Sequence, residues 1–249
     1  MKEYGCKFIW ITLQRRGNMK TKTQLWPAIG LLIFLSACQI KPEFINHAPP
    51  SLAVSMDVFS EDTLLAQFGC DEIQAPSSLI GGLEPSYPIA ICAIQNIPGE
   101  GREDLTAEID SGQFLYYTGG LFGSYVRYII YQNGEFVLLK TEEDLRKLFA
   151  PIESPEEALS YVLAVRNLSA YYGLQYDPAY EYEVDTLEDT YVTPDTDGHL
   201  VHVFHDQTFG CGPHWISEVD VHVSVEGNIE ERSSRHSFRD PTIDDVCFD

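Results

Sequence analysis

The chain has few basic residues. Its 249 residues include 16 Lys and Arg against 38 Asp and Glu, which gives a formal net charge of −22. Six of the basic residues and one acidic residue precede Cys38, so the rest of the chain is more acidic still. A nucleic-acid-binding surface needs a basic footprint, and adsorption on anionic lipid needs a basic patch. The composition therefore argues against nucleic acid as a partner.

Local signatures of the common enzyme classes are also missing. The sequence contains no Gly-x-Ser-x-Gly, no P-loop and no dinucleotide-binding fingerprint. It has neither Cys-x₂-Cys nor His-x₃-His, the spacings typical of zinc sites. Carboxylates are too numerous for one pair to stand out as a catalytic acid and base. These absences favour a non-enzymatic protein and indicate neither a cofactor nor a resident metal.

No apolar stretch near the N-terminus reaches the roughly 20 residues of a membrane-spanning helix. The apolar segment at 25–35 is shorter, follows the basic Met19-Lys20-Thr21-Lys22, and is followed by the small residues Ser36 and Ala37. The order positive, apolar, small predicts a secretory signal within residues 1–37. Residues 1–18 fit this pattern poorly. We expect a misassigned start with Met19 as the true first residue; an extended basic region is the alternative.

The signal ends in Leu35-Ser36-Ala37-Cys38, which resembles the lipobox of bacterial lipoproteins at all four positions. The resemblance implies diacylation of the Cys38 thiol, cleavage before Cys38 and acylation of the new amino group. Each buried CH₂ contributes about 0.8 kcal/mol, so several acyl chains anchor a protein stably. Gln39 in place of Asp implies the outer membrane of the bacterial cell envelope. The alternative is an ordinary signal peptide with an incidental cysteine.

Four cysteines remain after Cys38, an even number for an oxidising compartment. Three pairings are possible, and proximity in sequence favours Cys70–Cys92 and Cys211–Cys247. Each bridge would contribute roughly 3–4 kcal/mol through loop closure. A reactive Cys211 thiol beside nearby histidines is the alternative, but such a thiol must stay reduced. Cys247 offers it a bridging partner instead.

The prolines at 42, 49 and 50 and the lack of periodicity predict that residues 38–50 form a lipidated tether, an extended spacer. We expect a β-rich N-terminal half at 51–150. A helix plus an antiparallel sheet is expected at 151–249. Whether the two halves form one domain or two stays open.

Two local patterns in the middle of the chain are clear. Asn133-Gly134 separates the β-branched and aromatic runs 125–132 and 135–140, which predicts a hairpin with a type I′ turn. Ser154-Pro155-Glu156-Glu157 combines an N-cap serine, a proline at N1 and a glutamate at N3. It predicts the start of a helix that runs to about 168.

Four strands are expected to follow, at 180–184, 199–206, 219–226 and 229–238, with a turn at 194–198. The predicted fold class is therefore α+β, mostly antiparallel β with few helices, with a C-terminal helix packed on a four-strand meander. This element order resembles small secreted modules of the cystatin or PepSY kind. No motif carries the likeness, so it implies no function.

Six of the seven histidines fall between 199 and 236. On the predicted hairpin His202 lies opposite Asp220 and His222 lies one step along the diagonal, all on the solvent-facing side. This trio could bind Zn²⁺ or Cu²⁺, since imidazole and carboxylate are common ligands. The alternative is that these are ordinary polar residues of an exposed face. A metal-dependent envelope hydrolase using the His/Asp cluster at 199–222 is thus a second candidate function.

Two weaker patterns complete the sequence. Asp195-Thr196-Asp197-Gly198 resembles a fragment of a calcium loop but lacks its third acid and closing glutamate, so a turn is favoured. Tyrosines cluster between 161 and 182, either as core or as a face for sugars or peptides. The favoured interpretation is a lipid-anchored envelope protein that acts as a non-enzymatic binding or structural module. Its partner, apart from the membrane, is not specified.

Overall fold

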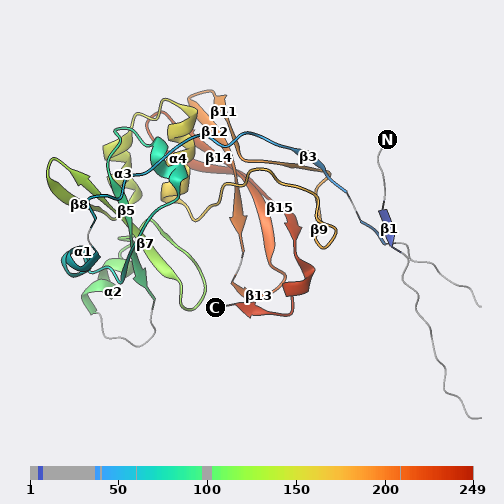
Figure 1. Ribbon diagram of the computed structural model, residues 1–249, viewed down its shortest axis with the longest axis horizontal. Coiled ribbons are helices and arrows are strands. Elements are labelled where there is room, and N and C mark those ends of the chain that lie inside the picture. Colours follow the sequence, from blue (N-terminus) through green and yellow to red (C-terminus); the bar gives the residue numbers. More distant parts are fainter. Residues whose placement is uncertain are drawn as a thin grey trace, which may run out of the picture.

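The computed structural model describes residues 5–7, 37–39, 41–59, 61–96, 103–207 and 209–248. Most of the predicted signal, residues 1–4 and 8–36, lies outside the described residues. Cys38 falls in β2 (Ala37–Gln39), which pairs with β1 (Gly5–Lys7), and only the backbone is described there. Two antiparallel sheets form the body, one at each end of the molecule (Figure 1).

The first sheet holds the predicted hairpin. Its order is β4-β5-β7-β6, and β8 also pairs with β7. Asn133 and Gly134 have φ of 54° and 88°, the positive values that a type I′ turn requires, so the hairpin prediction is confirmed. The strands are β4 (Glu72–Gln74), β5 (Ile89–Gln95), β6 (Tyr116–Tyr117), β7 (Ser124–Gln132) and β8 (Glu135–Leu139).

The second sheet is an antiparallel set of five strands in the order β11-β12-β14-β15-β9. The sequence predicts four strands here and a turn at 194–198. The extra strand, β11, includes Pro194, which an edge strand tolerates because its outer side needs no ladder hydrogen bond. The strands are β9 (Glu181–Tyr182), β11 (Tyr191–Asp195), β12 (Gly198–Asp206), β14 (Trp215–Ser224) and β15 (Ile229–Arg239).

A mostly β fold with few helices is confirmed, but the C-terminal helix on a four-strand meander is not. The helix in question, α4 (Pro155–Val165), begins at the predicted capping box. It is buried from Glu157 to Val165, because one hydrophobic cluster joins it both to the first sheet and to the second. It is therefore a central element between two sheets. The other helices are α1 (Glu61–Phe68), α2 (Glu103–Asp110) and α3 (Glu142–Phe149).

The 3-10 helix η1 (Ser78–Gly82) packs closely against α4. The Ser160 hydroxyl accepts a hydrogen bond from the Gly82 N–H at 3.0 Å and donates one to the Leu79 carbonyl at 2.6 Å. A Cβ on Gly82 would lie 2.6 Å from the Glu156 carbonyl oxygen, so only glycine allows this approach. The contact ties the N-terminal half to the central helix. A second 3-10 turn, η2 (Pro241–Ile243), lies near the C-terminus.

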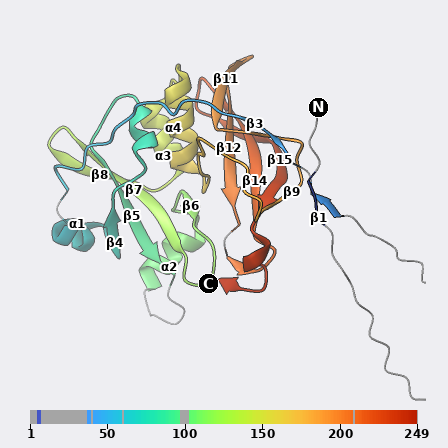
Figure 2. The same ribbon diagram turned by 45° about the vertical axis from the view of Figure 1, so that its right-hand side comes forward.

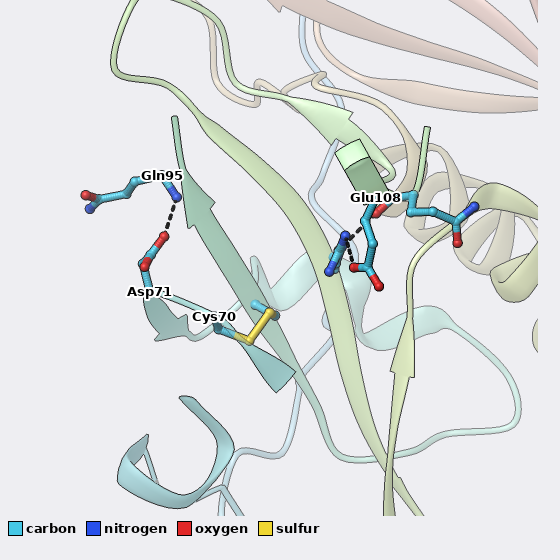
Figure 3. The surroundings of a disulfide bond; sticks show 7 residues. Cys70, Asp71, Gln95 and Glu108 are labelled. Atoms are coloured by element: carbon cyan, nitrogen blue, oxygen red, sulfur yellow. Dashed lines mark hydrogen bonds and ion pairs between the residues drawn. A yellow bond between two sulfur atoms is a disulfide. The ribbon is translucent and has the colours of Figure 1, made fainter. Parts of the chain in front are cut away.

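Both disulfides favoured by the sequence are present. Cys70–Cys92 joins the segment after α1 to β5, and its surroundings are shown in Figure 3. There the Asp71 carboxylate accepts a hydrogen bond from the Gln95 N–H at 2.8 Å, which holds the strand pair beside the bridge. Cys211–Cys247 joins the short strands β13 (Gly210–Cys211) and β16 (Cys247–Phe248). Cys211 is therefore not a free nucleophile.

Residues 43–47 differ from the predicted free spacer. β3 (Glu43–Ile45) pairs in parallel with β10 (Thr186–Glu188), a segment more than 140 residues away in sequence. Phe44 packs into a cluster with Tyr182, to which its ring lies edge-on at a centroid distance of 6.1 Å. We call residues 41–50 the strap. It lies along the body rather than extending away from it (Figures 1 and 2).

The strap is fastened by Asp189, whose side chain is fully buried. Its carboxylate accepts hydrogen bonds from the His47 N–H at 3.1 Å and the Asn46 amide at 3.1 Å. It also accepts bonds from the backbone N–H groups of Gly173 at 2.7 Å and Leu174 at 3.0 Å. Burial raises the pKa of this carboxyl, but the four bonds outweigh burial and leave the pKa below its usual range. Asp189 is thus an ionised clamp at neutral pH.

Among the described residues, no helix is long and apolar enough to cross a membrane.

Candidate functional site

The predicted pairing of His202 with Asp220 is confirmed. The two residues are opposite each other in the β12–β14 register, and His202 Nδ1 lies 2.8 Å from Asp220 Oδ1. The other oxygen of Asp220 accepts a hydrogen bond from the Ser233 hydroxyl of β15 at 2.6 Å. Three neighbouring strands therefore supply one connected group of polar side chains.

Asp220 is ionised in this group. Burial raises the pKa of its carboxyl, while the hydrogen bonds from Ser233 and His202 lower it by more, so that the pKa lies below the usual range. An ionised Asp220 needs a donor at His202 Nδ1, which assigns the proton to that nitrogen. His202 Nε2 is then the acceptor nitrogen when the ring is neutral.

His202 Nε2 points toward a second buried carboxylate. It lies 3.8 Å from Glu218 Oε1, and neither atom has a hydrogen-bond partner within the described part of the chain. Glu218 Oε2 accepts a bond from Arg235 Nε at 2.6 Å, which compensates its charge. Glu218 is 3 % exposed and His202 is 6 % exposed. A separation of 3.8 Å is too long for a hydrogen bond between them.

The expectation that all three residues face solvent is wrong for His202 and His222, which are buried, whereas Asp220 is half-buried. The Tyr191 ring stacks on His202 at a centroid distance of 4.9 Å and an interplanar angle of 14°. Phe204 also meets this imidazole edge-on, at a centroid distance of 5.5 Å. Phe204 itself belongs to the hydrophobic cluster against which Phe44 of the strap packs, so this part of the sheet is covered. Strand alternation alone does not show that both faces of the sheet are covered.

His222 does not join His202 and Asp220. Its Nε2 lies 2.9 Å from Asp197 and 3.8 Å from Asp195, two carboxylates of the β11–β12 turn. In the ranges that the structure describes, no group of three or more His, Cys, Asp and Glu could hold a metal ion. The geometry thus gives no support to a metal-dependent hydrolase at 199–222.

The remaining histidines of this region are dispersed. His214 lies between the carbonyls of Gln207 and Val246, at 3.2 and 3.0 Å. His236 stacks on Trp215 at a centroid distance of 5.0 Å. The clustering in sequence therefore reflects long adjacent strands and not one site.

The His202 group also differs from a hydrolytic triad. In a triad the hydroxyl of the nucleophile hydrogen-bonds to the imidazole, and the aspartate orients the ring from its other nitrogen. Here the Ser233 hydroxyl donates to Asp220, and the outer imidazole nitrogen faces the Glu218 carboxylate. A general base at His202 Nε2 would have no hydroxyl or thiol to activate within the described residues. The arrangement of Ser233, Asp220 and His202 therefore differs from that of an acyl-transfer triad.

A groove lies beside this group, between the strap, the start of α4 and the β11 edge. Its volume is about 310 Å³, at the lower end of small-molecule sites. Tyr191 links the two regions, because its ring contacts His202 and also lies 5.3 Å from the His47 ring. The groove is lined by His47, Ala48, Pro50, Pro155, Glu156, Leu159, Tyr172, Thr190, Tyr191 and Val192.

Tyr172 gives the groove a polar donor. Burial and the neighbouring Asp189 charge raise its pKa to about 12, so its hydroxyl stays protonated in neutral solution. Of the other clustered tyrosines, Tyr161 and Tyr182 are buried in the core, while Tyr171, Tyr176 and Tyr180 are half-buried. The half-buried members pack against the hydrophobic cluster that contains Tyr182, so the core interpretation fits most of the cluster, and a binding face for sugars or peptides stays a prediction.

Sequence reasoning missed His47 and Tyr191. No local signal marks them, because they meet only when the strap folds back on the second sheet. The alternating run that contains Asp220 also includes Glu218 as a polar position. That pattern did not indicate that Glu218 is buried.

No protein-family model, curated protein or solved structure matches this chain.

Proposed function

We propose that this chain is a lipid-anchored protein of the bacterial outer membrane, held by Cys38, and that its body is a non-enzymatic binding module. The sequence Leu35-Ser36-Ala37-Cys38 supports the anchor. The two disulfides are compatible with an extracytoplasmic protein. The absence of a nucleophile at the His202 group supports the non-enzymatic part of the proposal.

The observation that carries the binding role is the groove beneath the strap. Two tyrosines, Tyr172 and Tyr191, line it with aromatic carbon atoms and phenolic hydroxyls. Glu156 and His47 add hydrogen-bonding groups. A sugar ring has matching chemistry, with C–H groups on its face and hydroxyls around its edge.

The anchor is tested by fractionation of cells that express the chain with Cys38→Ala. The proposal expects wild-type protein in the membrane fraction and the variant outside it. Membrane retention of the variant would refute anchoring through Cys38.

The groove is tested by co-sedimentation with purified peptidoglycan sacculi, the sugar polymer of the bacterial envelope. We expect wild-type protein to sediment with the sacculi and Tyr172→Ala to remain in solution. Tyr131→Ala is the matched control, because Tyr131 is also half-buried but lies on the β7 hairpin away from the groove. Absence of wild-type sedimentation would refute a glycan ligand while leaving the anchor intact.

A further inference from the structure

The strap determines how far the body can lie from its anchor. Residues 43–47 are bound to the body by the β3–β10 pairing and by Asp189. The attachment extends to Lys41, whose ammonium lies 5.3 Å above the centre of the Tyr176 ring. Only residues 39 and 40 separate Lys41 from Cys38 in the sequence.

This short connection has a small reach. Three residue steps at roughly 3.3–3.6 Å each give about 10–11 Å between Cys38 and Lys41. The headgroup layer on each side of a bilayer is roughly 5–8 Å thick. If acyl chains hold Cys38 at the hydrocarbon boundary, Lys41 therefore lies within a few ångströms of the headgroup surface.

The surface around Lys41 combines tyrosine rings and a lysine, as membrane interfaces do, with the exposed carboxylates of Glu43 and Asp177. The loop at 174–180 brings Tyr176 and Tyr180 to this end, both half-buried. Tyr176 stacks on Tyr182 at 5.6 Å and Tyr180 stacks on Phe238 at 5.7 Å, so each ring is held by the sheet. Tyrosine is enriched at the membrane–water interface, where its ring sits at the level of the headgroups. Lysine favours the same level, because its stem can lie along apolar surface while its ammonium stays in water.

The opposite end of the molecule carries the first sheet. Figures 1 and 2 both show β3 and β9 at one end and α1 and β8 at the other. The Asn133-Gly134 turn and Glu135 lie on the β7–β8 hairpin and are exposed. An anchor near β3 thus directs one end of the body to the membrane and the other away from it.

We infer that the surface made by Lys41, Tyr176 and Tyr180 is a membrane-docking face that rests on the lipid headgroups of the bilayer that holds Cys38. This inference rests on the proposed lipid anchor. The ligand at this face is the phospholipid surface itself, and zwitterionic lipid suits it because Asp177 is exposed beside the two tyrosines. The strap is then a short rigid connector that sets orientation, and not a spacer.

The test uses full-length lipidated protein in phosphatidylcholine vesicles, with and without bromine on the acyl chains. Bromine quenches tryptophan at short range. Two variants carry the probe, Tyr176→Trp at the proposed face and Glu135→Trp at the far hairpin. Trp215 is the one tryptophan after Cys38 and gives the same background in both. Tyr180→Trp serves as a second probe if Tyr176→Trp does not keep the wild-type circular dichroism.

We expect brominated lipid to reduce the added fluorescence of Tyr176→Trp by about twofold, with little change for Glu135→Trp, as for an aromatic ring at the membrane interface. Equal quenching of the two probes in vesicle-bound protein would overturn the docking face while the anchor stands. Detergent-phase partitioning of the wild type is measured first. Failure to partition would overturn the anchor and the docking face together.

Discussion

The buried carboxylate of Asp189 accepts a hydrogen bond from the backbone N–H of His47 at 3.1 Å, across 142 residues of sequence. This contact, with the bonds to Asn46, Gly173 and Leu174, joins the strap to the second sheet. The groove and the proposed docking face both depend on the strap. The stability of this clamp is therefore the first property to test.

Asp189→Asn is expected to lower the free energy of unfolding by about 2 kcal/mol, because one carboxylate oxygen is replaced by an amide NH₂ group, a donor that would face the donors now bonded to Asp189. Amide hydrogen exchange at residues 43–47 should speed up more than exchange in β12. Glu183→Gln is the control, since Glu183 is exposed in the same region. Unchanged exchange in Asp189→Asn would contradict the clamp.

The same clamp predicts a pH dependence. The pKa of Asp189 is lower in the folded chain than in the unfolded one, so its stabilisation is complete above the unfolded pKa of about 3.9. The stabilisation is lost as the pH falls through the folded value. We expect lower protection factors in the strap, measured against the intrinsic exchange rate at each pH, below about pH 4. Protection of the strap that decreased as the pH was raised from 5 to 8 would contradict this prediction.

Glu108 of α2 is expected to stabilise the first sheet. Its carboxylate accepts bonds from Lys140 at 2.6 Å and from Arg127 at 2.9 Å, and the hydrogen bond with Lys140 is the main cause of its lowered pKa. Figure 3 shows Glu108 beside the Cys70 region. Arg127 is 1 % exposed, so removing its anionic partner leaves a buried charge.

Because Glu108 is itself 40 % exposed, solvent screening reduces the expected loss. We expect Glu108→Gln to cost on the order of 1–2 kcal/mol by urea denaturation. Glu143→Gln removes an exposed carboxylate that pairs with Arg146 and Lys147, and should leave stability near wild type. Equal effects of the two variants would show that the burial of Arg127 has no consequence.

The two disulfides should differ in their accessibility to reductant. Cys92 is fully buried and Cys70 is 6 % exposed, whereas Cys211 and Cys247 are both exposed. Thiol–disulfide exchange requires access to sulfur, so dithiothreitol should reduce Cys211–Cys247 first in the folded protein. Free thiols are alkylated at successive times, and peptide mapping then shows which cysteines were released first. Earlier labelling of Cys70 and Cys92 would contradict it.

The elements that were predicted correctly are those whose formation depends on a few residues that are neighbours in the sequence. Asn133-Gly134 specified the hairpin because few other pairs adopt two positive φ values. Ser154, Pro155 and Glu157 specified the start of α4 because their side chains satisfy its free N–H groups. Proximity in sequence was also enough to predict both cysteine pairings.

Features made by distant segments escaped prediction. β3 is three residues long between prolines, and its partner β10 lies more than 140 residues on, so no local pattern marks it. The second sheet looked half-exposed because Glu218, Asp220 and His222 alternate with valines. Around His202 this face is covered by Tyr191 and by the cluster around Phe204, which only the tertiary fold brings there, while much of β15 remains exposed.

The most direct test of the lipid anchor is mass spectrometry of the N-terminal peptide of protein purified from bacterial membranes. We expect a peptide that begins at Cys38, with a diacylglyceryl group on its sulfur and an acyl group on its amine. A peptide that begins upstream of residue 38, or one that begins at Cys38 without added lipid mass, would contradict it.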